Sequence, residues 1–136
     1  MVNYFPQQND GGIASTNFGN QCWDDTFYAG SSNRLNEHCP NLMGDILYCQ
    51  QNTTKKILLS LGGGGAPTYQ LTTATAGVAF ATQLWQQYGP YNQTYVDAGG
   101  IRPLDGGYDM IHGDPQYAID IDGFDFDIEV APTGEI

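Results

Sequence analysis

Residues 122–129 read Asp-Gly-Phe-Asp-Phe-Asp-Ile-Glu, an alternation of acidic and apolar side chains that predicts a β-strand. Successive side chains of a strand point to opposite faces of its sheet. One face of this strand therefore carries three acids: Asp125, Asp127 and Glu129. The other face carries three apolar residues, which we expect to pack under helices: Phe124, Phe126 and Ile128.

The row of acids carries the chemistry of this segment. Successive positions on one strand face are about 6.6 Å apart along the backbone. Three acids on a buried face are costly unless their carboxyl groups are protonated, hydrogen-bonded or functional. Crowding drives their pKa values apart, so the pattern predicts one carboxyl group that stays protonated near neutral pH and can donate a proton.

Two simpler interpretations of these acids compete with a functional one. A strand face exposed to solvent also accounts for a short acidic alternation. A calcium loop of the EF-hand type needs an acid at its third position, where Phe124 stands. None of the three cysteines belongs to a C-x-x-C pair, which argues against zinc. We therefore predict no metal site.

The segments around the motif predict parallel strands and helices. We expect the motif strand to cover residues 119–130. The apolar run of residues 57–59, ended by glycines 62–65, predicts a buried parallel strand followed by a turn. Residues 72–88 predict a helix ended by Gly89, because one face gathers five residues: Val78, Ala81, Leu84, Trp85 and Tyr88.

The remaining segments show weaker patterns. Residues 35–49 predict a short helix broken near Pro40, and residues 2–5 predict the end of a strand. Residues 7–30 read as a polar connection, and residues 91–117 as a long loop rich in Gly, Tyr and Asp. Strand, helix, strand, helix, strand is the order of a parallel α/β protein.

Length and charge limit the possible partners. The 136 residues are enough for one small domain, and the net charge is −11. Such a chain repels phosphate backbones and anionic membrane surfaces, so we expect no nucleic-acid partner and a neutral ligand instead. No stretch reaches the roughly 18–20 apolar residues of a transmembrane segment, and the first residues show no signal-peptide pattern.

Two motifs together resemble a known family. Residues 122–129 match the D-x-x-D-x-D-x-E signature of the family 18 glycoside hydrolases, with every acid present. Ser60-Leu61-Gly62-Gly63 matches the S-x-G-G motif that this family carries on the preceding strand. Further stretches resemble fungal members of the plant-type (class III) chitinases, so that the resemblance covers essentially the whole chain: residues 2–6, 17–22, 56–63, 101–106 and 120–124.

The resemblance implies a (β/α)8 TIM barrel that hydrolyses the β-1,4 links of chitin without a cofactor. Glu129 would protonate the bridging oxygen and then activate water, while the acetamido oxygen of the substrate acts as nucleophile. Asp127 would hold the acetamide and stabilise the oxazolinium intermediate. Asp125 would share a proton or hydrogen bond with Asp127, and Asp122 would brace the base of the strand.

Other residues have supporting roles in this interpretation. Ser60 is either a hydrogen-bonded support beneath the acids or a simple turn residue. Gly62 and Gly63 would allow a sugar ring or neighbouring backbone to approach closely. Three tyrosines offer stacking faces to sugars, with core or loop packing as the simpler role of each: Tyr4, Tyr108 and Tyr117.

A complete barrel needs about 250 residues. We therefore expect residues 1–136 to form an incomplete catalytic domain that covers roughly the second to fourth strands, with little or no chitinase activity alone. In the family, the equivalents of Cys22 and Cys39 pair with each other. The equivalent of Cys49 pairs with a cysteine after the first strand, upstream of this chain.

Asn52 and Asn92 each begin an N-x-T triplet and are expected glycosylation sites of an extracellular, secreted or wall-associated protein. Three other functions fit the sequence less well. An inactive carbohydrate-binding relative would usually lack Glu129 or Asp127. An endo-β-N-acetylglucosaminidase shares the acids but not the class III flanking sequence. An acidic structural protein would not need the Ser60 motif.

Overall fold

The computed structural model of the chain describes residues 2–4, 15–16, 40–62, 73–100, 102–105, 116 and 118–127. Helices and strands alternate in these ranges, in the order β1 (Val2–Tyr4), β2 (Ser15–Thr16), α2 (Pro40–Asn52), β3 (Leu58–Gly62), α3 (Ala74–Tyr88), α4 (Gln93–Asp97) and β4 (Gly123–Asp127). The predicted α/β class is confirmed.

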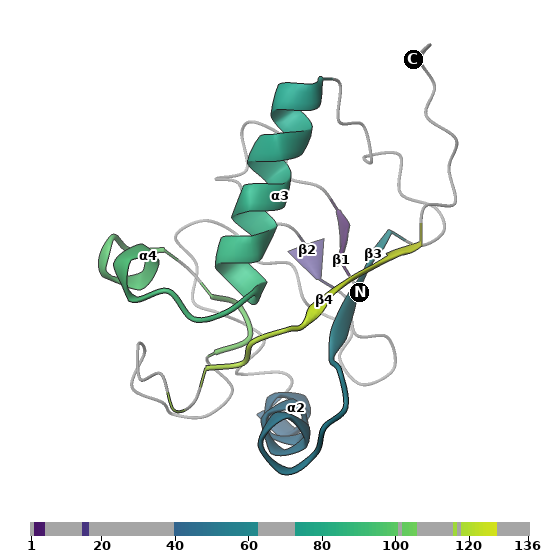
Figure 1. Ribbon diagram of the computed structural model, residues 1–136, viewed down its shortest axis with the longest axis vertical. Helices are drawn as coiled ribbons and strands as arrows, with labels where there is room; N and C mark the ends of the chain where they lie inside the picture. Colours follow the sequence, from purple (N-terminus) through teal and green to yellow (C-terminus); the bar gives the residue numbers. More distant parts are fainter. Residues whose placement is uncertain are drawn as a thin grey trace.

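The described strands form one sheet in the order β2-β1-β3-β4 (Figure 1). β1 pairs with β3 in parallel, and β3 pairs with β4 in parallel. β2 runs antiparallel to β1. The sequence does not indicate β2, because its two residues are too few to show an alternation within the polar connection of residues 7–30.

A single hydrophobic cluster joins α2, α3 and β3. In Figure 1, α3 runs beside β4, and α2 lies near the start of β3. Burial of each large apolar side chain contributes about 1.5–3 kcal/mol, so this cluster is the main tie between the helices and the sheet. Its buried members come from both helices, β3 and the segments before β4: Met43, Leu59, Leu61, Phe80, Leu84, Tyr88, Leu104, Ile119 and Ile121.

Helix α3 has clear caps at both ends. The Thr73 side chain accepts a hydrogen bond of 3.0 Å from the Ala76 amide, which satisfies a donor that the first helical turn leaves free. At the other end the Gly89 amide donates to the Trp85 carbonyl. A Cβ at position 89 would lie 2.6 Å from that carbonyl oxygen, so only glycine fits there.

The buried face of α3 differs from the predicted one. Val78 is 68% exposed and Trp85 is 46% exposed, although both belong to the predicted apolar face. The buried side chains of the helix are instead Phe80, Leu84, Gln87 and Tyr88. Apolar residues occur on both faces of α3, so contact with the sheet decides which face is covered.

Two shorter helices also depart from the predicted boundaries. α2 begins at Pro40 instead of breaking there, because the fixed φ of proline suits the first position of a helix. α4 lies inside the predicted loop of residues 91–117, and its N-cap is the side chain of Asn92, which accepts from the Tyr95 amide at 3.2 Å. None of the helices in the described ranges is long and apolar enough to cross a bilayer.

β4 is shorter than the predicted strand of residues 119–130. It begins at Gly123, because the residues before it bond to other partners than a neighbouring strand. The Ile121 amide donates to the Tyr88 carbonyl at 2.9 Å, at the end of α3. The Asp122 amide donates to the Ile57 carbonyl at 2.8 Å, just before β3. Residues 128–130 lie outside the described part of the chain.

Candidate active site

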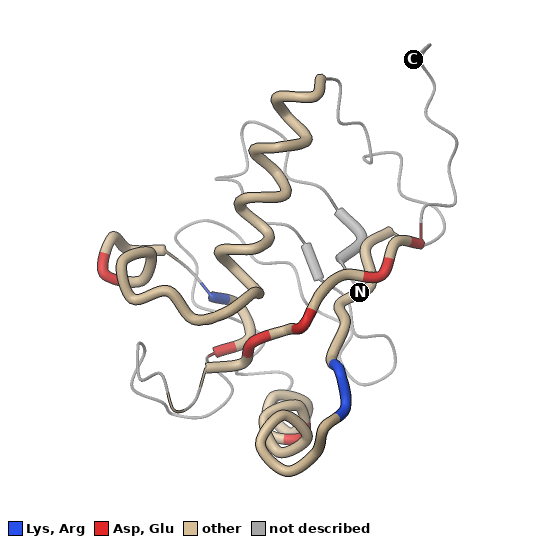
Figure 2. Tube along the Cα trace, viewed as in Figure 1, with Lys and Arg blue, Asp and Glu red and all other residues tan. Residues whose placement is uncertain are grey.

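The parallel register of β3 and β4 places Ser60 beside Asp125. Side chains alternate along each strand, and Leu59 and Leu61 on either side of Ser60 are buried in the core. Ser60, Asp125 and Asp127 therefore lie on the sheet face directed away from the core. Figure 2 shows how acidic residues recur along β4.

Ser60 and Asp125 are joined by a hydrogen bond. The Ser60 hydroxyl donates to Oδ2 of Asp125 over 3.3 Å. Asp125 is exposed, whereas Ser60 and Asp127 are half-buried. The exposure of Asp125 agrees with the simpler of the interpretations left open by the sequence, a strand face that is open to solvent.

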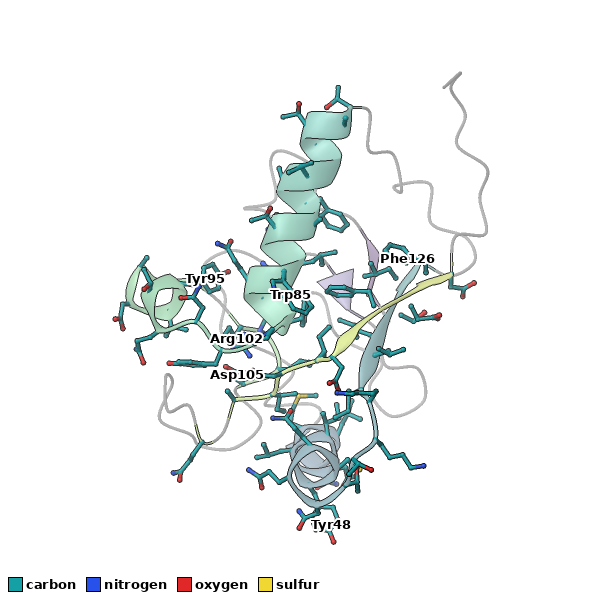
Figure 3. The ribbon with its side chains drawn as sticks, in the orientation of Figure 1. Tyr48, Trp85, Tyr95, Arg102, Asp105 and Phe126 are labelled. Atoms are coloured by element: carbon teal, nitrogen blue, oxygen red, sulfur yellow. The ribbon has the colours of Figure 1, made fainter. Side chains whose placement is uncertain are left out.

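Among the described residues, the opposite face of β4 meets α3 at Phe124. The Phe124 ring meets the Trp85 ring edge to face, with 6.3 Å between the ring centroids, and Phe124 packs against the core. Phe126 is 73% exposed, although it lies on the same face, as Figure 3 shows. The predicted packing under helices is thus confirmed for Phe124 and wrong for Phe126, whose ring is mostly exposed.

Gly62 ends β3 directly beside Asp127. Its φ angle is 123°, a conformation that residues with a Cβ rarely adopt. A glycine at this position lets the chain turn and leaves no side chain next to the Asp127 carboxyl group. Gly63, which follows it, lies outside the described residues.

Asp122 joins the beginnings of β3 and β4. Its carboxylate accepts a hydrogen bond of 2.7 Å from Lys56 Nζ and another of 2.9 Å from the Ile57 amide. These two donors lower the pKa of Asp122, with the Lys56 bond as the larger cause. Asp122 therefore lies at the opposite end of the strand pair from Asp127.

A buried ion cluster that the sequence does not indicate lies near the start of β4. Arg102 is 6% exposed and pairs with Asp105 at 2.6 Å and with Asp120 at 2.7 Å. Burial raises the pKa of Asp105, while the bond from Arg102 acts in the opposite direction. Arg102 belongs to a stretch that resembles class III chitinases, yet nothing in its local pattern reveals these partners, because one of them is 18 residues away.

Several predicted site residues lie outside the described ranges: Glu129, Gly63, Tyr108, Tyr117, Cys22 and Cys39. Tyr4 belongs to β1, where only the backbone is described. Cys49 is an exposed free thiol, and both Asn52 and Asn92 are exposed. Among the described residues, no group of three or more His, Cys, Asp or Glu side chains could hold a metal ion.

The described elements thus define an α/β protein whose motif strand displays carboxylates on the face away from the core. No protein-family model matches the chain. Over 131 residues, which are 95% of this chain and 12% of the relative, it is 41% identical to Endochitinase A of Emericella nidulans.

Two further fungal endochitinases match the chain at similar identity and over the same share of its length. Endochitinase A of Aspergillus niger is 37% identical over 130 residues, and Endochitinase A1 of Aspergillus fumigatus is 39% identical over 132 residues. Each match covers 95% of this chain, but the chain spans only 9% and 14% of these two relatives. The chain is a homologue of one segment of the fungal endochitinases, which confirms its recognition as a fungal chitinase segment.

Proposed function

We propose that this chain is the segment of a chitinase that carries the catalytic acids, and that the protein containing it hydrolyses β-1,4 links between N-acetylglucosamine units. One observation carries the proposal: the match to a fungal endochitinase extends over 95% of a chain that itself contains the whole acidic motif. The orientation of Asp125 and Asp127 away from the core supports it, because catalytic side chains must reach the substrate.

The proposed architecture is an incomplete (β/α)8 barrel made by residues 1–136 as one domain. β1, β3 and β4 would be roughly its second to fourth strands. Their parallel pairing and their sequential order within the sheet support this assignment, since barrel strands are parallel and follow each other in sequence.

The proposed mechanism uses the acids in a fixed order along the strand. Glu129 protonates the glycosidic oxygen, and the bond to the leaving sugar breaks as the acetamido oxygen of the substrate attacks C1. Asp127 orients the acetamide and stabilises the positive oxazolinium, and Asp125 shares a hydrogen bond with Asp127. Glu129 then takes a proton from the water that opens the oxazolinium, so the configuration at C1 is retained.

Ser60 supports this arrangement through its hydrogen bond to Asp125. Gly62 and Gly63 give the substrate or neighbouring backbone room beside the acids. Three tyrosines are proposed as stacking faces for the sugars: Tyr4, Tyr108 and Tyr117.

The proposed cellular setting is the extracellular space or the cell wall, where chitin is the partner of the protein. A disulfide between Cys22 and Cys39 and glycans at Asn52 and Asn92 would suit that setting. The exposure of Asn52 and Asn92 supports their modification, because a glycan needs free space around the asparagine.

A transplant experiment tests the proposal. Residues 1–136 replace the matching segment of Endochitinase A of Aspergillus niger, and the chimaera and the isolated chain are each incubated with a fluorogenic chitotrioside. We expect turnover by the chimaera and none by the isolated chain, because positioning and electrostatic surroundings supply much of catalysis.

The same chimaera separates the alternatives. Cleavage of a high-mannose glycopeptide in place of chitin oligosaccharides would indicate an endo-β-N-acetylglucosaminidase. Binding of chitin oligosaccharides without turnover would indicate an inactive carbohydrate-binding relative. Either outcome would contradict the chitinase proposal.

A further inference from the structure

β4 carries the acids, so its register against β3 decides where the carboxyl groups stand. It pairs only with β3 among the described strands, at the end of the sheet. A slip by two residues would keep every side chain on its present face, so the alternation alone does not forbid it. Phe124 packs against Trp85 and the core, but Phe126 is 73% exposed, so side-chain packing resists such a slip only near the start of the strand.

The five residues before β4 are held far more firmly. Ala118, Ile119 and Ile121 are each at most 4% exposed. Their backbone groups bond to partners from four different parts of the chain, none of which is a sheet strand: Gln50 in α2, Tyr88 at the end of α3, Arg102 and Asp105 in the following connection, and Ile57 before β3.

The side chain of Gln50 makes two hydrogen bonds to the backbone of this segment, as a neighbouring strand would. Its Nε2 donates to the Ala118 carbonyl at 3.2 Å, and its Oε1 accepts from the Asp120 amide at 3.0 Å. The side-chain amide of Gln50 directs one N–H of Nε2 and the oxygen Oε1 to the same side, as the N–H and C=O of one residue in a β-strand do. Both bonds can form only at one position of residues 118–120 along the chain direction relative to α2.

Arg102 fixes the position of the same segment relative to α3. Its Nη2 donates to the Ile119 carbonyl at 3.1 Å and to Oδ1 of Asp120, while its Nη1 donates to the Gly89 carbonyl at 2.7 Å. Because the guanidinium is planar and rigid, these bonds tie the segment to the end of α3. In Figure 3, Arg102 and Asp105 lie beside the segment that leads into β4.

We propose that Gln50 and Arg102 are positioning residues that set the register of β4, and thereby the height at which Asp125 and Asp127 stand beside Ser60 and Gly62. The consequence for catalysis rests on the proposed function. The effect of Gln50 and Arg102 on the register of β4, which we call the register clamp, does not. A slip by two residues would move each carboxyl group by about 6.6 Å, far more than a catalytic site tolerates.

The test uses the purified 136-residue chain and amide hydrogen exchange by NMR. Gln50→Ala removes both bonds to the segment. We expect the protection factors of residues 119–122 and of β4 to fall by about 10- to 100-fold, because buried backbone groups lose their partners. The cross-strand contact between the backbones of Ser60 and Asp125 should weaken in parallel, and amides in the middle of α3 should keep their protection.

Gln51→Ala is the matched control. Gln51 is the exposed neighbour of Gln50 on the same helix, and it makes a single bond of 3.3 Å to the Gln116 carbonyl. This variant should leave the protection of β4 unchanged. Equal losses in both variants, a uniform loss that includes α3, unchanged rates in Gln50→Ala, or a wild-type chain without protection at residues 119–122 would each overturn the proposal.

Gln50→Glu adds a readout that a loss of general stability would not reproduce. A protonated carboxyl group has one donor and one acceptor and can replace both amide bonds, whereas the ionised group cannot donate to Ala118. Protection of β4 in this variant should therefore be low at pH 7 and recover at pH values where the introduced carboxyl group is protonated. Loss of protection that is equal at both pH values would overturn the proposal.

The wild-type chain, measured at the same pH values, corrects for the charged groups around the segment: Lys56, Arg102, Asp105, Asp120 and Asp122. Because no substrate is used, the result is independent of whether the protein is a chitinase. A register clamp without chitinase activity in the chimaera would count against the proposed function alone.

Discussion

Ser60 and Asp125 stand side by side on β3 and β4, joined by a hydrogen bond of 3.3 Å on the sheet face that points away from the core. The two residues come from the two separate motifs that resemble family 18 glycoside hydrolases. The structure thus brings together two stretches that are 65 residues apart in sequence. Their contact gives the first prediction.

Ser60→Ala should lower the kcat of the chimaera by roughly tenfold, because Asp125 loses a partner that holds its carboxyl group in place. The free energy of unfolding should change by less than about 0.5 kcal/mol, since Asp125 is exposed. Ser60→Thr keeps the hydroxyl group and should retain most of the activity. Equal losses in both variants would show that the hydroxyl group is not what matters.

Gly62→Ala should destabilise the chain by about 1–3 kcal/mol, because a Cβ strains the backbone at a φ of 123°. Urea denaturation measures this change. Gly123→Ala is the control in the same strand pair, since its Cβ would meet Leu58 at an acceptable 3.4 Å and its φ is not positive. A larger loss at position 123 than at position 62 would contradict the argument from the positive φ of Gly62.

Stability should depend on pH through Asp122. The pKa of Asp122 is lowered in the folded chain. Its contribution to the free energy of unfolding is therefore complete above the ordinary pKa of 3.8 and is lost as the pH falls through the folded pKa. The difference in urea midpoint between wild type and Asp122→Asn should therefore shrink below pH 3.8. Lys56→Gln should remove most of the same pH dependence. A difference that stays constant from pH 6 to pH 2.5 would contradict this interpretation.

Asn92→Ala should destabilise α4 by about 1 kcal/mol, because the Tyr95 amide loses its capping acceptor. Exchange of the Tyr95 amide in unglycosylated protein measures this effect. Asn92→Asp removes the glycosylation triplet but keeps an oxygen acceptor, so the helix should stay intact. If the Tyr95 amide exchanges equally fast in both variants, the side-chain cap is not what stabilises α4.

The longer elements could be predicted from the sequence. The run of residues 57–59 and the acidic alternation both give strands, and α3 begins within two residues of its predicted start. The buried face of α3 could not be predicted, because Val78 and Phe80 are similarly apolar and only contact with the sheet distinguishes them. α4 and β2 are too short for any periodicity to appear.

The candidate site was predictable as a motif but not as a network. The alternation gives the shared face of Asp125 and Asp127 directly. The bonds of Gln50 to the segment before β4 cross 68 and 70 residues of sequence, and no local pattern encodes them. The burial of a row of acids also depends on what covers the sheet, which the strand alone does not determine.

Glu129→Gln in the chimaera tests the central claim most directly. The amide keeps the size of the side chain but cannot donate a proton to the glycosidic oxygen, so kcat on chitotrioside should fall by about 10²–10⁴-fold with little change in oligosaccharide affinity. Gln51→Ala in the same chimaera should leave kcat unchanged. Turnover by Glu129→Gln within a few-fold of the unmodified chimaera would contradict the assignment of this strand as the catalytic one.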